Sequence, residues 1–240
     1  MVYCLMSLTG LFPVNSYSFK RRSILEGLPS SDIALLTSDS KTVKYKKNEI
    51  LFTEGEPAKC IYLILSGRVK KFKKTCHDRE QIFYMASSGE LIGFHALFSD
   101  GIFQDSASTI DECSICIISL KSFQAVLKKS PDLNGRLLHS MSHEYNVLMN
   151  LIMMLSTKST RERLAIHLLL LYNNQGAELQ SNGNYQINIS RDILASLVGT
   201  VRENIVRLLA EFIELGLIKK EGRKLEIINL PQLIRLANCS

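Results

Sequence analysis

A group of charged residues near the C-terminus has the chemistry needed to read DNA bases. Arg202, Glu203 and Arg207 lie within residues 189–216, which read ISRDILASLVGTVRENIVRLLAEFIELG. An arginine can donate two parallel hydrogen bonds to guanine O6 and N7, and a glutamate can accept one from the cytosine amino group. The ordinary alternative is a solvated helix face with an i,i+4 pair between Glu203 and Arg207. The three residues alone leave both interpretations open.

Two short helices are predicted to position these side chains. Ser190 is a favourable N-cap for a first helix that runs to about Val198, and Gly199 permits a tight turn. Thr200 and Glu203 have the spacing of a capping box that opens a second helix. At about 100° per residue, the second helix gathers its apolar side chains on one face, namely Ile205, Leu208, Leu209 and Phe212. The pattern predicts a helix-turn-helix with the charged residues pointing outward.

The segment after the second helix predicts a wing. Leu217–Lys220 and Lys224–Ile228 are strand-like and are separated by a glycine turn. Phosphate contacts are expected from Ser190, Arg191, Thr200 and Lys224. The net charge of +6 and the pI of about 9.0 permit a polyanionic partner without requiring one. These features together favour double-stranded DNA as a partner.

The N-terminal half predicts a β-rich domain. Between about Val43 and Leu120, short apolar runs alternate with glycine turns at intervals typical of a β-barrel or sandwich. The expected strands include Ile50–Thr53, Ile61–Leu65, Arg68–Lys73, Gln81–Met85 and Cys113–Ile118. Lysines 70, 71, 73 and 74 are interpreted as a solvated hairpin that protects an edge strand, rather than as a nucleic-acid patch.

A long helix is predicted between the two regions. Its a/d spacing of 4-3-4-3-4 is typical of a coiled coil. The expected seam consists of Leu137, Met141, Glu144, Leu148, Leu151 and Leu155. Self-pairing in a parallel homodimer is the favoured explanation, and burial of the stripe against the same chain is the alternative.

Composition limits the remaining classes of function. The 240 residues are 46% hydrophobic and 22% charged, as in globular proteins. Six scattered cysteines and the lack of a secretory signal predict a cytoplasmic protein with reduced thiols. No glycine-rich phosphate loop, nucleophile elbow or HExxH motif is present, so the chain is not expected to be an enzyme.

The sequence resembles the Crp–Fnr family of bacterial transcription regulators over nearly the whole chain after Ser23. The resemblance rests on ILFTEGEPAKCIYLILSGRVK, SGELIGFHALF, the long helix and ISRDILASLVGTVRENIVRLL. It implies an α+β fold with an N-terminal cyclic-nucleotide-binding-like β-roll, a long dimerisation helix and a C-terminal winged helix-turn-helix. The expected boundaries are a tail at 1–22, a sensor at 23–132, the helix at 133–157 and a DNA-binding domain at 158–240.

The resemblance also implies how such a protein acts. It implies a homodimer on a palindromic site, with Arg202, Glu203 and Arg207 at base-reading positions and half-sites with a TGA-like core. Val206 stands where the fumarate-nitrate branch has Ser. RNA polymerase is the implied protein partner, through the predicted loop Asn173–Asn184.

The effector site departs from the cyclic-AMP pattern. In the family's cyclic-AMP binders a Glu holds the ribose hydroxyl and an Arg followed by Ser or Thr holds the phosphate. Alignment places Phe94 at the Glu position and Asp105, followed by Ser106, at the Arg position. Because an anion there repels a phosphate, we expect no response to cyclic AMP. A neutral ligand, or no small ligand, stays open.

Two further pairs of residues are weaker candidates for metal or haem binding. Cys113 and Cys116 have metal-pair spacing, but residues three apart on a strand point to opposite faces, which favours structural cysteines. Cys76 and His77 lie in the hairpin from which the family's carbon-monoxide sensors take haem ligands. The alternative functions are therefore a haem or redox sensor on the same frame, or a ligand-binding module that regulates a protein partner. No metal or cofactor is predicted.

Overall fold

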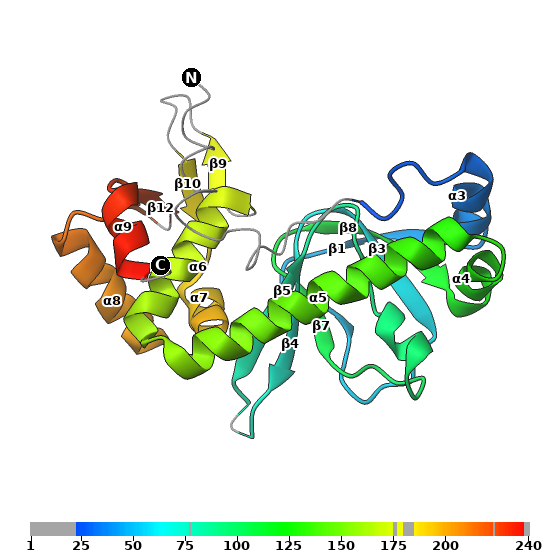
Figure 1. The fold of residues 1–240 in the computed structure, drawn as a ribbon, viewed down its shortest axis with the longest axis horizontal. Coiled ribbons are helices and arrows are strands. Elements are labelled where there is room, and N and C mark those ends of the chain that lie inside the picture. Colours follow the sequence, from blue (N-terminus) through cyan, green and yellow to red (C-terminus); the bar gives the residue numbers. More distant parts are fainter. Residues whose placement is uncertain (1–22, 77, 175–176, 180–184, 223, 238–240) are drawn as a thin grey trace. The chain divides into compact units, whose positions relative to one another are not determined.

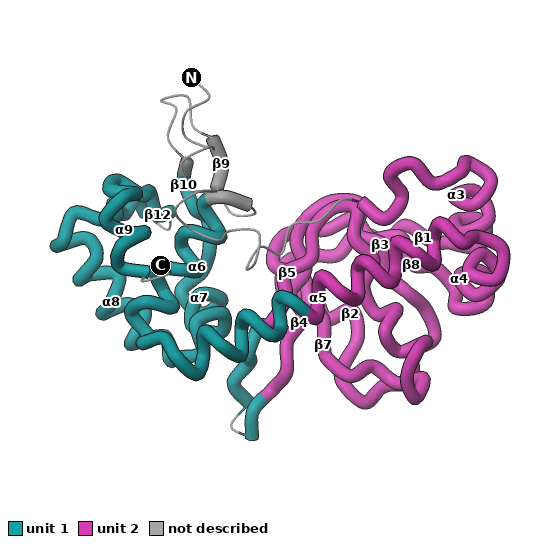
Figure 2. Tube along the Cα trace, viewed as in Figure 1, with its two compact units in different colours: residues 1–18, 75–82, 146–240 teal, residues 19–74, 83–145 magenta. Residues whose placement is uncertain are grey.

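The computed structural model describes residues 23–76, 78–174, 177–179, 185–222 and 224–237. These residues form two compact units, which Figure 2 shows in different colours. We call residues 23–74 and 83–145 the sensor unit, and residues 75–82 and 146–237 the winged-helix unit. Each unit is described on its own below.

The sensor unit contains a β-roll made of two four-stranded sheets (Figure 1). The first has the order β1 (Lys41–Tyr45), β8 (Cys113–Ser119), β3 (Cys60–Ser66) and β6 (Leu91–Ile92). The second has the order β2 (Ile50–Phe52), β7 (Ser106–Thr109), β4 (Val69–Lys74) and β5 (Glu80–Ala86). The five strands predicted from the sequence are all present, with ends that differ by at most one residue.

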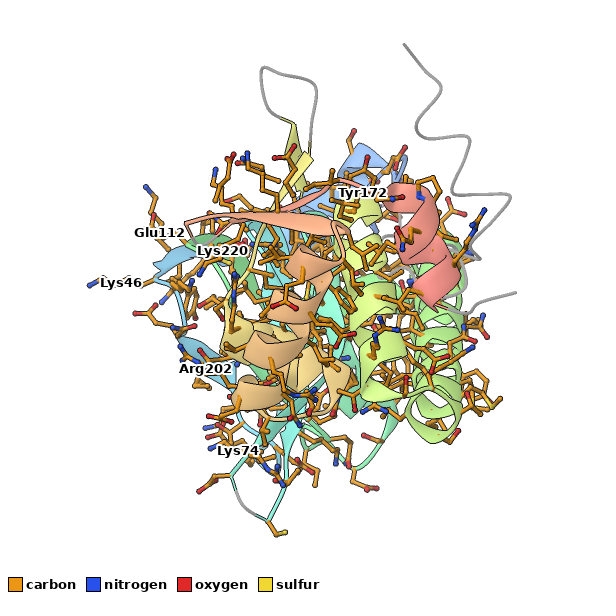
Figure 3. All side chains as sticks on the ribbon, turned by 90° about the vertical axis from the view of Figure 1, so that its left-hand side faces the viewer. Lys46, Lys74, Glu112, Tyr172, Arg202 and Lys220 are labelled. Carbon is orange, nitrogen blue, oxygen red and sulfur yellow. The ribbon has the colours of Figure 1, made fainter. Side chains whose placement is uncertain are left out.

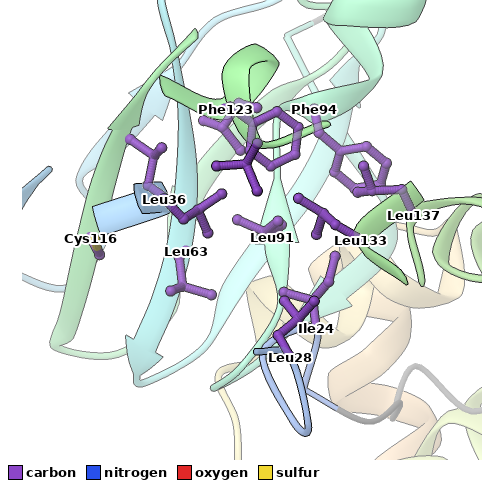
Figure 4. Packing of buried hydrophobic residues seen from close by; sticks show 13 residues of the cluster. Ile24, Leu28, Leu36, Leu63, Leu91, Phe94, Cys116, Phe123, Leu133 and Leu137 are labelled. Carbon is purple, nitrogen blue, oxygen red and sulfur yellow. The ribbon is translucent and has the colours of Figure 1, made fainter. Parts of the chain in front are cut away.

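Helices close the core of the sensor unit. They are α3 (Ser30–Thr37), the 3-10 helix η1 (Phe94–Phe98), α4 (Leu120–Leu127) and the start of α5 (Pro131–Thr157). Figure 4 shows Leu133 and Leu137 of α5 beside Phe94 and Leu91 in one apolar cluster. The first turns of α5 are therefore part of the sensor core.

The packing of α5 corrects the predicted dimer seam. Leu137 is buried in the sensor core, Met141 packs against that core, and Glu144 is only 5% exposed. These three residues face their own chain, so their assignment to a dimer seam is wrong. Further along, Leu151 is half-buried, and Leu148 and Leu155 are 38% and 37% exposed.

A second heptad set on α5 is more exposed than the predicted one. We call it the exposed stripe: Leu138, Tyr145, Met149 and Ile152, with exposures of 67%, 61%, 44% and 58%. It is offset by one residue from the predicted seam. The same 4-3 spacing fits both sets, and the predicted set contains more leucines, which is why the sequence pattern selected it.

The winged-helix unit combines helices with a small antiparallel sheet. The helices are α6 (Thr160–Asn174), α7 (Arg191–Val198), α8 (Arg202–Glu214) and α9 (Leu230–Ala237). The sheet has the order β11 (Ile218–Glu221), β12 (Lys224–Ile227), β10 (Tyr185–Asn188) and β9 (Ala177–Leu179). The predicted wing is confirmed as β11 and β12. The predicted loop at 173–184 contains β9, which its polar sequence did not reveal.

No helix in the described part of the chain is long and apolar enough to cross a membrane.

Candidate nucleic-acid interface and effector region

Local capping and one glycine set the geometry of the helix-turn-helix. The Ser190 hydroxyl accepts a hydrogen bond from the backbone N–H of Ile193 at 3.2 Å, so the predicted N-cap of α7 is confirmed. Gly199 ends α7 with φ at +72°, a conformation that glycine adopts without the strain of a Cβ atom. The chain can therefore turn at once into α8.

The predicted capping box of α8 is wrong. The N-cap is Val201, and no side chain caps this end of the helix. The Thr200 hydroxyl accepts a hydrogen bond from the Asn204 amide at 3.0 Å instead. Glu203 is consequently exposed rather than folded back onto its own backbone. Its carboxylate is available to a partner in a groove.

The three predicted base-reading residues lie together on the outer side of α8. Arg202, Glu203 and Arg207 are all exposed, and we call them the reading face. Figure 3 labels Arg202 beside the N-terminal turn of the helix. The opposite face is buried, as predicted, through Ile205, Leu208, Leu209 and Phe212. Within the described residues, neither Glu203 nor Arg207 makes a hydrogen bond or ion pair with another side chain.

Arg202 already has an acidic neighbour. Its Nη1 lies 3.2 Å from Oδ2 of Asp192 on α7, and both side chains are more than half exposed. An ion pair of this kind contributes about 0–1 kcal/mol. Arg202 can therefore leave Asp192 for a guanine at low cost.

The residues expected to contact phosphates surround the turn and the wing. Ser190, Arg191, Thr200 and Lys224 are all partly exposed. Burial, with the nearby charge of Arg202 adding to it, lowers the pKa of Arg191. A phosphate beside these two guanidinium groups would relieve their mutual repulsion.

Two residues of α6 brace the helix-turn-helix, and sequence reasoning missed both. Arg163 Nε donates to the Val198 carbonyl at 2.8 Å. One turn later His167 is buried and hydrogen-bonds to the backbone of Leu197, and burial lowers its pKa to about 4. The i,i+4 spacing of a cation and an imidazole inside an apolar helix is the signal that could have found them. Together they fix the C-terminal end of α7.

The residues assigned to the effector pocket have three different surroundings. Phe94 is fully buried in the sensor core and stacks on the His95 ring, with centroids 4.2 Å apart. The Ser106 hydroxyl accepts a hydrogen bond from the Glu54 backbone N–H at 3.0 Å. Phe94 thus serves as core and Ser106 fixes a neighbouring loop, which leaves Asp105 as the charged group of this region.

Asp105 belongs to a buried charge cluster, which we call the Lys71 network. Lys71 Nζ lies 2.6 Å from Oε2 of Glu144 and 3.3 Å from Oδ2 of Asp105. His95 Nε2 lies 3.4 Å from the same Glu144 oxygen. The four residues come from β4, the segment before β7, α5 and η1, so one ammonium joins both the β-roll and the long helix. Sequence reasoning did not anticipate this network.

The network corrects the prediction of a solvated lysine hairpin. Lys71 is 2% exposed and Lys70 is 9% exposed, with its ammonium 4.8 Å from the centre of the Phe72 ring. Only Lys73 and Lys74 of the four are exposed. Burial is tolerated because each of the two inner ammonium groups has a partner.

The electrostatics of the network are dominated by burial and by its internal pairs. Burial alone lowers the pKa of Lys71, but the charges of Glu144 and Asp105 outweigh it and raise that pKa. Burial raises the pKa of Asp105 against the opposing charge of Lys71. Lys71 is therefore a cation at neutral pH, already matched by carboxylates of its own chain.

The cysteines predicted to be structural are buried and free. Cys116 packs in the sensor core, whereas the Cys113 thiol lies 3.4 Å from the Arg68 carbonyl. Cys76 is exposed, and His77 lies outside the described residues. Among the residues that the structure describes, no group of three or more His, Cys, Asp or Glu side chains is arranged to hold a metal ion.

Comparison with known proteins agrees with this geometry. A cyclic nucleotide-binding domain family model matches residues 42–130, and a Crp-like helix-turn-helix domain model matches residues 162–236. The CRP-like cAMP-activated global transcriptional regulator of Mycobacterium tuberculosis is 27% identical over 219 residues, which cover 90% of this chain and 97% of that protein. The fumarate and nitrate reduction regulatory protein of Escherichia coli is 29% identical over 192 residues, 80% of this chain and 76% of that protein.

Solved structures show the same fold. The c-di-GMP-responsive global regulator CLP of Xanthomonas campestris matches with a TM-score of 0.76 and 23% identity, covering 84% of this chain and all of that one. These relatives are regulators rather than enzymes. Since a cyclic nucleotide-binding domain and a Crp-like helix-turn-helix domain follow one another in this chain, and the chain aligns with most of the length of these regulators, it belongs to the Crp–Fnr family of transcription regulators.

Proposed function

We propose that the protein is a homodimeric regulator that binds a palindromic DNA site through α8 of each copy. The observation that carries the proposal is the reading face of Arg202, Glu203 and Arg207, exposed on the first two turns of a helix whose other face is buried. The N-terminal part of a recognition helix is the part that meets base edges in the major groove. Two-fold related copies would place their half-sites about one DNA turn apart.

A gel-shift series tests the reading face. Arg202→Ala and Arg207→Ala each remove a guanine donor from both copies, so each is expected to weaken specific binding by about 5- to 150-fold per half-site. Arg235→Ala removes an exposed arginine from α9 and serves as the matched control, with little change expected. If both reading-face variants bind the specific site as tightly as the control, the assignment of this face is refuted.

The residues around the reading face are proposed to hold the DNA backbone. Lys224→Ala is expected to weaken binding about equally for all sequences and to reduce the slope of log affinity against log salt concentration by about 1 for each copy in the dimer. Ser190, Arg191 and Thr200 would orient the duplex in the same way. A loss of specificity in Lys224→Ala, with an unchanged salt slope, would contradict the backbone role.

The exposed stripe of α5 is the proposed dimer contact. Tyr145, Met149 and Ile152 repeat with 4-3 spacing and are exposed in the single chain, and a second copy of the same helix would bury them in a coiled coil. Ile152→Glu is expected to convert the dimer to a monomer in analytical ultracentrifugation. Asn146→Glu places the same charge on an exposed position beside the stripe, about 100° around the helix from Tyr145 and outside the a and d positions, and should remain dimeric. A dimeric Ile152→Glu would refute this seam.

The effector is proposed not to be cyclic AMP. Among the relatives, the Mycobacterium tuberculosis regulator is cAMP-activated and the Xanthomonas campestris regulator is c-di-GMP-responsive. The resemblance aligns Asp105 with the Arg of cyclic-AMP binders, and its partner Lys71 is also paired with Glu144. A cyclic phosphate would have to displace a carboxylate from a buried ammonium, which is costly.

Calorimetric titration with cyclic AMP tests this point. We expect no binding up to millimolar nucleotide and no change in DNA affinity. Saturable binding of cyclic AMP, or a change in DNA affinity when it is added, would refute this proposal.

The cytoplasm is the proposed location. The four cysteines within the described residues, Cys60, Cys76, Cys113 and Cys116, are all free, as expected for a reducing compartment.

RNA polymerase is the proposed protein partner. Transcription from a promoter carrying the bound site, with purified RNA polymerase, tests whether the protein changes polymerase output. An unchanged transcript level with the site fully occupied would argue against a direct contact.

A further inference from the structure

An aliphatic side chain lies in the middle of the reading face. Val206 is 51% exposed on α8. At about 100° per residue, Val206 is about 40° around the helix from Arg202, while Glu203 and Arg207 are about 100° and about 140° from it. Val206 therefore lies between Arg202 on one side and Glu203 and Arg207 on the other.

The fold does not require a valine at this position. The buried face of α8 is already complete without it, and half of the Val206 side chain is in contact with solvent. A β-branched residue is also slightly unfavourable in an exposed helix compared with Ala, Lys or Glu. Nothing in the packing or in helix propensity accounts for an apolar side chain among charged ones.

DNA chemistry does account for it. In the major groove, guanine offers acceptors for an arginine, cytosine offers a donor for a glutamate, and thymine offers a C5-methyl group for an apolar side chain. The reading face supplies the first two types of side chain. We infer that Val206 supplies the third, and that it contacts the C5-methyl group of one thymine in each half-site. This inference rests on the proposed DNA binding by α8.

The methyl group can be tested alone by replacing thymine with uracil. Each thymine of one half-site, and its two-fold mate, is replaced in turn by deoxyuridine, which keeps the same hydrogen-bonding groups. Burial of one methyl group predicts that one position loses about three- to fivefold in affinity per half-site, while the other thymines change little. Val206→Ser, which has a similar helix propensity, is expected to bind the thymine and uracil sites equally at that position.

Ile213→Ser is the matched control. Ile213 is 39% exposed on the same helix, two turns and about 10 Å further from the N-terminal end that meets base edges. This variant should discriminate thymine from uracil as the unchanged protein does. If uracil weakens binding at no position, or if Val206→Ser still discriminates at that position, the inference is overturned. If the unchanged protein shows no specific binding to any site, the proposed function itself fails, which is a different outcome.

Discussion

Removal of the buried ammonium of Lys71 should destabilise the sensor unit strongly. Its distances of 2.6 Å to Glu144 and 3.3 Å to Asp105 correspond to attractions of about 6 and about 5 kcal/mol at an effective dielectric constant of about 20. Desolvation of all three groups offsets much of this sum. Removing one partner of such a buried pair costs about 3–5 kcal/mol, because the remaining charges stay buried without compensation.

We therefore expect Lys71→Met to lower the free energy of unfolding by about 3–5 kcal/mol. In urea, with a slope of about 2 kcal/mol/M, the midpoint would fall by about 2 M. The chain has no tryptophan, so far-UV circular dichroism is the appropriate probe. The transition of the sensor unit is the one expected to move.

Lys73→Met provides the matched control on the same strand. Lys73 pairs with Glu54 at 2.5 Å, but both side chains are about half exposed, so its loss should cost about 0–1 kcal/mol. Combining Lys71→Met with Glu144→Met should restore part of the lost stability, since one buried charge is removed and apolar volume replaces it. If Lys71→Met is no less stable than Lys73→Met, the network does not stabilise the fold and the reasoning is refuted.

Three further predictions concern the winged-helix unit. Because the pKa of His167 is lowered to about 4 in the folded protein, the unfolded chain binds the proton more tightly, and the free energy of unfolding should fall as the pH drops from about 6.5 towards 4. Urea titrations at pH 7.5 and 5 should give free energies of unfolding that differ by about 2 kcal/mol. His167→Phe should remove this difference. Asp192→Asn frees Arg202 and removes an anion near the duplex, so it should tighten DNA binding by a few-fold in gel shifts at low salt and less at high salt. Gly199→Ala forces a Cβ onto a φ of +72° and should lower the thermal midpoint of this unit in calorimetry, with a cost of about 1 kcal/mol; an unchanged midpoint would contradict the strain.

Much of the fold follows from periodicity in the sequence. The short apolar run Ile61–Leu65 between glycine turns predicted β3, although the strand is buried on both faces from Ile61 to Ile64 and Leu65 is 42% exposed. The buried face of α8 was equally predictable from the 3.6-residue period. Both patterns are local, which is why one sequence was sufficient.

The wrong predictions concern segments in which the same sequence pattern fits more than one structure. Thr200 and Glu203 have capping-box spacing, yet Asn204 takes the threonine hydroxyl, a competition that spacing alone does not reveal. The first half of the predicted dimer seam was wrong because two heptad sets, offset by one residue, share α5, and tertiary packing buries Leu137, Met141 and Glu144 against their own chain. β9 was missed because a short strand at a sheet edge needs no apolar alternation.

The Lys71 network could not be predicted because its members are far apart in sequence. Lys71 and Glu144 are separated by 73 positions, and lysines and glutamates are rarely buried. Exposed charge was therefore the reasonable expectation for each one taken alone. In the fold, α5 brings Glu144 next to Lys71 on the β-roll. Each of these two charges can be buried because the other one neutralises it.

The sharing of Glu144 between helix and β-roll also determines where this protein can be cut or fused. A β-roll fragment that ends before α5, or a chimera that takes α5 from another regulator, would separate the Glu144 carboxylate from Lys71 and leave Asp105 as the remaining carboxylate beside its ammonium. Fragments that extend through Tyr145 retain both partners and the apolar contacts of Leu133 and Leu137. Sensor modules designed for transplantation should therefore carry the first four turns of the long helix as part of their hydrophobic core.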